Sequence, residues 1–339
     1  MTHRFLVKDI ALQAGLGTAT VDRVLNGRAG VRRQTAERVH HAIRELEAQA
    51  GQLAASGRKF IIDLVVEAPQ TFRETLDAAI RQEMPLMQPA SFRIRSDTRT
   101  HFPPDEMERA LSRAARLGSH GVIVMAPDTG PIRDAIDRLD TEGIPVITLA
   151  TDLPGTRRRA YVGLDNTSAG RTAAWFLHKW LARHTRPRIL VTIRNDRFRG
   201  EEEREKAFRQ ALQTMLPDAE LAVIVEGHDT VEFTRRVGET VGTAPPDGLY
   251  SIGGNNRLLL SAIRNAGAQK PILIGHDLDP DNRALLAEGA IDLILYHDLA
   301  EDIRNACRVV LAAHSRGAMP KPPDGAALRL AVPPMADPI

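Results

Sequence analysis

The glycines in GLGTATVDRVLNG, residues 15–27, have a spacing that could hold a phosphate. A dinucleotide-binding loop needs G-x-G-x-x-G directly after a strand, because only glycine lets the backbone approach a pyrophosphate at a helix N-terminus. Here Thr20 stands at the third glycine position, and the apolar residues of the preceding segment 7–14 repeat with the period of a helix. The spacing therefore favours two helices joined by a glycine turn over a phosphate loop.

The second of these helices, residues 18–25, is expected to present a hydrogen-bonding face. Gly15 would supply the positive φ that ends the first helix, and the apolar residues of 18–25 share one side. The opposite side carries small and polar residues of the kind that a recognition helix offers to the major groove, namely Thr18, Ala19, Asp22 and Arg23. The segment is predicted to be a helix-turn-helix.

Residues 7–47, VKDIALQAGLGTATVDRVLNGRAGVRRQTAERVHHAIRELE, resemble the N-terminal DNA-binding domain of the LacI/GalR family of bacterial repressors. The matching elements are the turn at Ala14 and Gly15, the run TVDRVLN from Thr20 to Asn26, and a third helix from about Arg32 to Glu47. The resemblance implies that double-stranded operator DNA is a partner of this chain.

The resemblance also implies which side chains contact DNA. Thr18 and Ala19 would face base edges, and Arg23 would reach a guanine in the major groove, where a bidentate pair is worth about 1–3 kcal/mol of discrimination. The residues expected at phosphates are Thr20, Asn26, Arg32 and Arg33; for the last two a solvated surface role stays open. Gly17 and Asp22 depart from the serine that most members carry, so Asp22 must accept from a cytosine or pair with a basic neighbour.

The connector that follows, residues 48–59, allows two interpretations. AQAGQLAASG could be a flexible linker. By the resemblance it would instead be a hinge helix that inserts a leucine into the minor groove, and Leu53 is the large apolar candidate.

Composition limits the classes of protein that fit. The chain has 339 residues and one cysteine, Cys307, so it has no intrachain disulfide, and we expect that thiol to be a buried apolar group. The N-terminus lacks an apolar signal core, and no run of eighteen apolar residues occurs, so we expect a cytoplasmic protein without a membrane span. Residues 1–60 carry a net charge of +5 and the remainder −3, as expected for a basic DNA-binding module on a separate sensing body.

From residue 60 onward, short apolar strands alternate with amphipathic helices. The predicted strands are 60–66, 91–95, 121–126, 145–150, 160–164, 188–193, 221–227, 248–253, 271–277 and 291–298, and the predicted helices include 106–117, 132–142, 168–184, 203–216 and 258–266. This alternation, which occurs twice, predicts an α/β fold of two lobes, each a doubly wound parallel sheet, with ligands at the carboxyl ends of the strands.

Within the resemblance, this part is the periplasmic-binding-protein-like effector domain. The expected organisation is a small all-α head at 1–47, a hinge or linker at 48–59, and an effector-binding and dimerisation domain at 60–335. Lobe 1 would hold about 60–162 and 297–320, and lobe 2 about 163–296 and 321–335. The family's chain crosses between the lobes three times.

Polar side chains that follow the predicted strands are the candidate ligand contacts, because strand ends converge between the lobes. Those that match sugar-binding relatives best are Arg199, Asn255 and Asp277; further candidates are Asn195, Asp128, Asp152 and His297, and the last three have a helix N-cap as an equal alternative. Phe72 and Phe198 are candidates to cover the apolar face of a sugar.

These features predict a ligand-responsive transcription regulator, a repressor that binds a palindromic operator as a homodimer. Its effector is expected to be a sugar, a polyol or a sugar acid. No catalytic motif, metal ligand set or cofactor motif occurs in the sequence, so we expect no enzyme activity, metal or cofactor. The alternative is a cytoplasmic solute-binding protein of a sugar system. The sequence does not decide between an inducer and a corepressor, or between a dimer and a tetramer.

Overall fold

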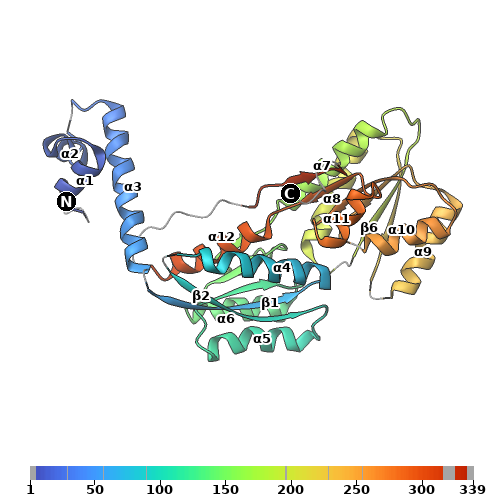
Figure 1. Ribbon diagram of the computed structural model, residues 1–339, viewed down its shortest axis with the longest axis horizontal. Coiled ribbons are helices and arrows are strands. Elements are labelled where there is room, and N and C mark those ends of the chain that lie inside the picture. Colours follow the sequence, from blue (N-terminus) through green and yellow to red (C-terminus); the bar gives the residue numbers. More distant parts are fainter. Residues whose placement is uncertain are drawn as a thin grey trace.

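The computed structural model describes residues 5–28, 30–55, 57–88, 90–194, 197–227, 229–253, 255–315 and 325–333. The first three helices form a separate head at one end of the molecule (Figure 1). Helix α1 (Val7–Ala14) ends at Gly15, whose φ of 61° confirms the predicted left-handed turn. Helix α2 (Thr18–Leu25) then buries Val21 in a small core with Ile10 of α1 and Val39 of the third helix. The predicted helix-turn-helix is present.

Helix α3 (Arg33–Ala55) extends eight residues beyond Glu47, where the sequence predicted its end. The added segment, AQAGQLAA, is rich in alanine, which has the highest helix propensity, and its glycine costs only about 1 kcal/mol. The backbone of most of the predicted connector is therefore helical. Leu53 lies on this helix, but its side chain is outside the described residues.

Lobe 1 is a parallel sheet covered by helices on both faces. The strand order is β2-β1-β3-β4-β5, and the strands are β1 (Lys59–Glu67), β2 (Ser91–Arg99), β3 (Gly121–Met125), β4 (Val146–Leu149) and β5 (Ala160–Val162). Helices α4 (Gln70–Glu83) and α12 (Leu299–Ala313) contribute to one core, and α5 (Pro104–Arg116) and α6 (Gly130–Thr141) to the core on the other face. A short 3-10 turn, η1 (Met84–Leu86), follows α4.

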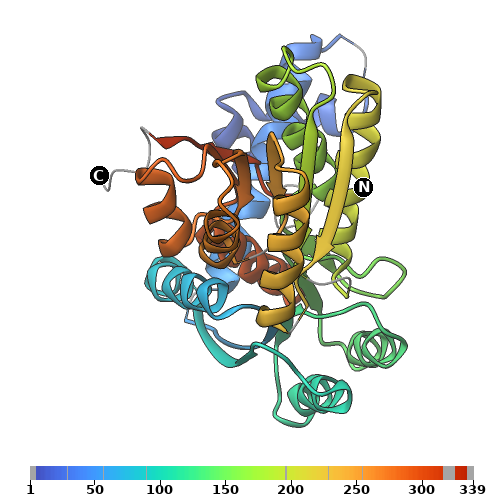
Figure 2. The same cartoon turned by 90° about the vertical axis from the view of Figure 1, so that its right-hand side faces the viewer.

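Lobe 2 repeats this arrangement beside lobe 1, as the two views in Figure 1 and Figure 2 show. Its strand order is β11-β10-β9-β8-β6-β7, with β6 (Arg188–Ile193), β7 (Glu220–Val225), β8 (Gly248–Ser251), β9 (Ile272–His276), β10 (Leu293–Tyr296) and β11 (Arg329–Ala331). Helices α7 (Asn166–Trp180) and α8 (Arg199–Met215) cover one face; α9 (Thr230–Thr243), α10 (Asn256–Asn265) and α11 (Pro280–Ala287) cover the other.

One strand differs from the prediction of two purely parallel sheets. Strand β11 pairs antiparallel with β10 at the edge of lobe 2. It comes from the proline- and alanine-rich tail, and its three residues are too few to show the alternation by which a strand is recognised in sequence. The correction is local, because the other pairings are parallel.

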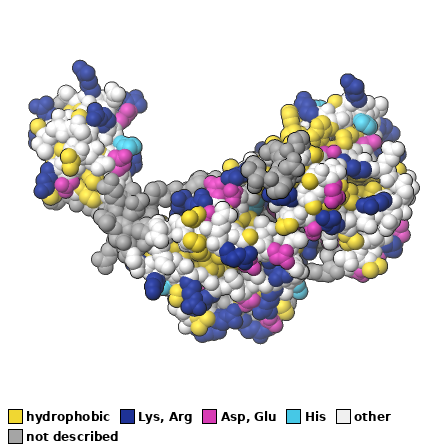
Figure 3. All heavy atoms as spheres, viewed as in Figure 1, with side chains coloured by type: hydrophobic (Ala, Val, Ile, Leu, Met, Phe, Trp, Pro, Cys, Tyr) yellow, Lys and Arg dark blue, Asp and Glu magenta, His cyan; other side chains and the backbone are white. Residues whose placement is uncertain are grey.

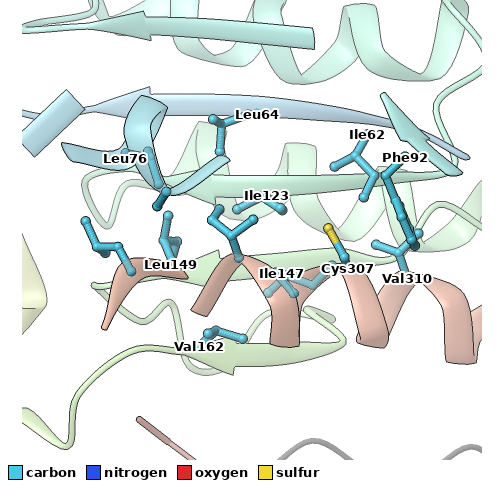
Figure 4. Close-up of a cluster of buried hydrophobic side chains, with 14 of the residues drawn as sticks. Ile62, Leu64, Leu76, Phe92, Ile123, Ile147, Leu149, Val162, Cys307 and Val310 are labelled. Atoms are coloured by element: carbon cyan, nitrogen blue, oxygen red, sulfur yellow. The ribbon is translucent and has the colours of Figure 1, made fainter. Parts of the chain in front are cut away.

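Helix α12 follows a lobe 2 strand in sequence but packs in lobe 1. Figure 4 shows its Cys307 and Val310 among Ile62, Ile123 and Ile147 of the lobe 1 strands. Cys307 is fully buried, and this burial raises the pKa of its thiol to about 12, so the sulfur stays protonated. It is therefore a core residue, as the sequence predicts.

The close packing of α7 on α8 yields a stability prediction. A Cβ built on Gly170 would clash with the backbone of Arg204 and approach Phe208 N to 3.0 Å. Gly170→Ala should therefore force the helices apart and cost about 1–3 kcal/mol, measured by denaturant unfolding. Gly238→Ala on α9 is the matched control, because a Cβ there meets nothing within 4 Å. Equal stability of the two variants would contradict this account of the α7–α8 contact.

Candidate functional site

The exposed face of α2 carries the predicted DNA-contacting residues. Thr18, Ala19 and Arg23 are exposed, and Arg23 has no carboxylate partner among the described residues. Figure 3 shows several Lys and Arg side chains on the visible face of the head. An unpaired arginine on an exposed helix face is available for a phosphate or a guanine.

Asp22, which departs from the family pattern, is held within the head. Its carboxylate accepts a hydrogen bond of 2.8 Å from Asn26 Nδ2 and lies 3.3 Å from Arg28 Nη1. The negative charge is thus offset by a basic neighbour, one of the two expected solutions. Arg32 and Arg33 are exposed at the start of α3, where Arg33 pairs with Glu37 at 2.8 Å.

A cavity of about 350 Å³ lies between the lobes at the carboxyl ends of their strands. This volume is in the range of small-molecule sites. Five of the predicted ligand contacts border it: Phe72, Phe198, Asn255, Asp277 and His297. The fold therefore brings together, from distant parts of the sequence, two aromatic rings and three polar side chains.

The three polar side chains of this set differ in how far their hydrogen-bonding atoms are already used within the protein. Asn255 is the N-cap of α10, and its side-chain oxygen accepts from Leu258 N at 3.2 Å. Asp277 has a left-handed backbone with φ of 64°, and its carboxylate has no partner among the described residues. His297 is buried, and its Nδ1 is hydrogen-bonded to Asp302. Asp277 is thus an acceptor that a ligand can use.

Three predicted contacts do not border the cavity. Asp128 pairs with Arg133, with oxygen–nitrogen distances of 2.5 and 2.7 Å, and Arg199 pairs with Glu203 at 2.7 Å. Asp152 is held by Arg158 and Thr148; although burial opposes ionisation, these hydrogen bonds lower the pKa of its carboxyl. Neither Asp128 nor Asp152 is a helix N-cap, so local arginine pairs account for both carboxylates.

The remaining predicted contact, Asn195, lies outside the described residues. The cavity also holds polar residues that the sequence analysis did not name, chiefly Arg204, Asn256, His276 and Glu67. A signal for Arg204 was present: together with Gly200, Ala207 and Phe208 it follows the helical period of the buried face of α8. Because glutamates surround Arg204 in residues 199–205, RGEEERE, the sequence analysis did not recognise it as part of a buried face.

Several contacts join the lobes beside the cavity, and in one of them Arg197 Nη1 of lobe 2 lies 2.9 Å from His101 Nδ1 of lobe 1. Glu67 at the end of β1 accepts from Arg197 Nη1 at 2.9 Å, and Gly200 N donates to Thr151 Oγ1 at 3.1 Å. Glu67 also accepts from Phe102 N at 2.9 Å and is 2 % exposed. These bonds hold the two lobes close together in this structure.

Within the described residues, no group of three or more His, Cys, Asp or Glu side chains is placed to hold a metal ion. Across the same part of the chain, no helix has the length and apolar character that crossing a membrane requires.

Comparison with solved structures identifies the two-lobed fold. A glucose-galactose binding protein from Geobacillus stearothermophilus superposes with a TM-score of 0.70 at 18% identity, covering 82% of this chain and 98% of that one. A solute-binding protein from Actinobacillus succinogenes with bound D-allose gives 0.68 at 15%, covering 82% and 99%. A candidate LacI transcriptional regulator from Bacteroides fragilis gives 0.70 at 16%, covering 82% and 98%. These likenesses establish the fold.

Comparison with protein families identifies both parts of the chain. Residues 91–317 match the family described as periplasmic binding protein domain, and residues 6–47 match the bacterial regulatory proteins of the lacI family. A search of curated proteins finds no match. The chain therefore belongs to the lacI family of bacterial regulatory proteins by its head, residues 6–47, and has a periplasmic binding protein domain, residues 91–317, as its body.

Proposed function

We propose that this protein is a repressor that binds a palindromic operator as a homodimer and is switched by a small hydroxylated metabolite: a sugar, a polyol or a sugar acid. The observation that carries the proposal is the union, in one chain, of an exposed recognition helix and a polar cavity of about 350 Å³. The names of two structural neighbours, which bind glucose and galactose or D-allose, support the ligand class.

In this proposal the head reads DNA through α2. Thr18, Ala19 and Arg23 contact bases, while phosphates are contacted by Thr20, Asn26, Arg32 and Arg33. One head reads only a half-site, so a two-fold symmetric dimer matches a palindrome. Leu53 remains our candidate for a wedge in the minor groove, because it lies on the part of α3 nearest the body.

In the cavity, Asp277 and Asn255 bind hydroxyl groups of the ligand, and His297 is a further contact. The rings of Phe72 and Phe198 cover the apolar side of the ligand. A ligand that binds one arrangement of the two lobes more tightly than another shifts the population of the protein toward the arrangement that it binds better. The shift moves the chain that leads to α3, and the spacing of the two heads changes with it. We infer a cytoplasmic binding protein without enzymatic activity.

A second candidate function is a solute-binding protein without regulatory DNA binding, because two of the neighbours above are binding proteins of that fold. The lacI head at residues 6–47 favours the regulator. Measurement of sequence-specific DNA binding separates the two functions.

Arg23→Ala should remove operator discrimination while leaving salt-sensitive background binding. The lost guanine contact is worth about 1–3 kcal/mol. The operator would first be selected from random duplexes with the full chain, and the ratio of specific to nonspecific affinity then measured for each variant. Arg44→Ala, which removes an exposed cation from α3 instead, is the control and should keep the ratio. An unchanged ratio in Arg23→Ala would refute its role.

Asp277→Asn should weaken ligand binding at least about tenfold, because a hydrogen bond to a charged group contributes about 1.5–3 kcal/mol. Asparagine tolerates the left-handed backbone at this position, so the fold should persist. The measurement is a thermal-shift screen against hexoses, pentoses, alditols and sugar acids, followed by titration of each hit.

The control for this experiment is Asp218→Asn, an exposed carboxyl of lobe 2 that does not border the cavity. It should bind like the wild type. A hit that binds both variants equally well would place the ligand elsewhere than at Asp277.

A further inference from the structure

Arg204 is a buried cation that has no carboxylate partner among the residues that the structure describes. Its side chain borders the cavity and the residue is only 6 % exposed. Nε donates to Asn166 Oδ1 at 2.7 Å and Nη1 donates to Ile252 O at 3.1 Å, so both acceptors are neutral. Nη2 has no acceptor among the described residues. A buried charge that lacks a counter-ion is costly, and an anion beside it would offset that cost.

The imidazole of His276, which the charge of Arg204 acts on, is itself neutral. Burial, then the charges of Arg204 and His297, hold the pKa of His276 well below its ordinary value, so this imidazole is neutral. His276 Nε2 is 2.7 Å from Tyr250 Oη, and its Nδ1 has no partner in the described part of the chain. Asn256 Oδ1, which also borders the cavity, is unpartnered too. Two residues that border the cavity thus each hold a buried polar atom without a partner among the described residues.

Most other charges of the cavity are already engaged within the protein. Glu67 pairs with Arg197, and Arg257 pairs with Asp281 at 2.9 Å. Glu201 accepts from Arg194 N at 2.8 Å, and Asp279 caps α11 through Asn282 N. Arg194 lies 3.9 Å from Glu226. Arg204 and Asp277 are the cavity charges that the protein leaves for a ligand within the described residues.

We propose that the effector is a sugar acid whose carboxylate binds Arg204 and whose hydroxyl groups donate to Asp277. The inference rests on the proposed function, since it names the chemical class that the same cavity takes. A carboxylate can accept charge-assisted hydrogen bonds from the remaining guanidinium nitrogen, Nη2. A phosphate carries up to two negative charges, and within the described residues the cavity offers no second unpaired arginine to balance them. Asp277 would also repel a doubly charged phosphate more strongly than a carboxylate.

The test compares ligands that differ at one carbon. The first series has one ring and differs at C6, which is a hydroxymethyl group in D-glucose, a carboxylate in D-glucuronate and a phosphorylated hydroxymethyl group in D-glucose 6-phosphate. The second series is open-chain and differs at C1, which is a hydroxymethyl group in D-glucitol and a carboxylate in D-gluconate. D-galactose and D-galacturonate form a third series. Titration calorimetry of the full chain, with sodium acetate at matched concentration as the salt control, gives the affinity of each.

In any series that binds, the carboxylate should bind at least about tenfold more tightly than its neutral partner, because charge-assisted hydrogen bonds are about twice as strong as neutral ones. Arg204→Gln should reduce this preference to within about twofold. Arg209→Gln, on the same helix but exposed and paired with Glu205, should keep it. If Arg204→Gln fails to fold, Arg204→Lys and the wild-type comparison still decide the ligand class.

Equal or tighter binding of the neutral sugar, or tightest binding of the phosphate, overturns the inference and leaves the sugar-responsive regulator intact. A carboxylate preference that survives in Arg204→Gln overturns the assignment to Arg204. Failure of every compound to bind, with folded protein and intact operator binding, counts against the proposed effector class itself.

Discussion

The hydrogen bonds of one buried guanidinium hold together the part of lobe 2 that borders the cavity. Arg204 lies on α8, its Nε bonds Asn166 in the first turn of α7, and its Nη1 bonds the carbonyl of Ile252 at the end of β8. Three elements are thereby fixed at the edge of the sheet where the cavity opens. The arrangement also needs Gly170, because α7 and α8 approach so closely there that a side chain would meet the backbone of Arg204.

The order of the strands explains why the polar residues meet at all. In both lobes the strands are parallel over most of the sheet, so their carboxyl ends lie along one edge, and helices begin immediately after them. Asn255 follows β8 and Asp277 follows β9, neighbouring strands of lobe 2, while Phe72 is on the helix after β1 of lobe 1. A cavity between two such edges collects side chains that are far apart in sequence.

Sequence patterns predicted the fold well, because the apolar residues of each helix or strand repeat with the period of that element. The turn at Gly15, the alternation of apolar strands with helices, and the strand-end positions of Asn255 and Asp277 are local features, and the structure has them. The sequence alone could not show which of the acidic side chains at the strand ends pair with an arginine of the protein. Asp128 and Asp152 follow strands as Asp277 does, yet nearby arginines pair with the first two, while Asp277 has no partner in the described part of the chain.

The same limit applies where an element depends on tertiary contacts or on weak propensities. Strand β11 forms only because β10 offers an open edge, and α3 continues past Glu47 because its alanines favour helix where a linker was equally compatible with the composition. Arg204 was hidden for a related reason. It stands among glutamates in the sequence, and only packing shows that its side chain turns inward.

Strand β1 gives a physical route from cavity to head. It begins at Lys59, just after the residues that lead from α3, and ends at Glu67, which borders the cavity and bonds Arg197 of lobe 2. Its first residues are anchored to the rest of lobe 1: Arg58 donates to His314 O at 3.1 Å, and Ile61 N donates to His120 Nδ1 at 3.1 Å.

A packed strand does not stretch. A displacement of Arg197 must therefore either move lobe 1 as a body or break the hydrogen bond between Arg197 and Glu67. Either response alters how the lobes meet while α3 stays attached at the other end of the same strand. In the proposed function the ligand therefore need not touch the linker to affect the head. It needs only to favour one placement of lobe 2 against lobe 1, where Glu67, His101 and Thr151 contact lobe 2 residues.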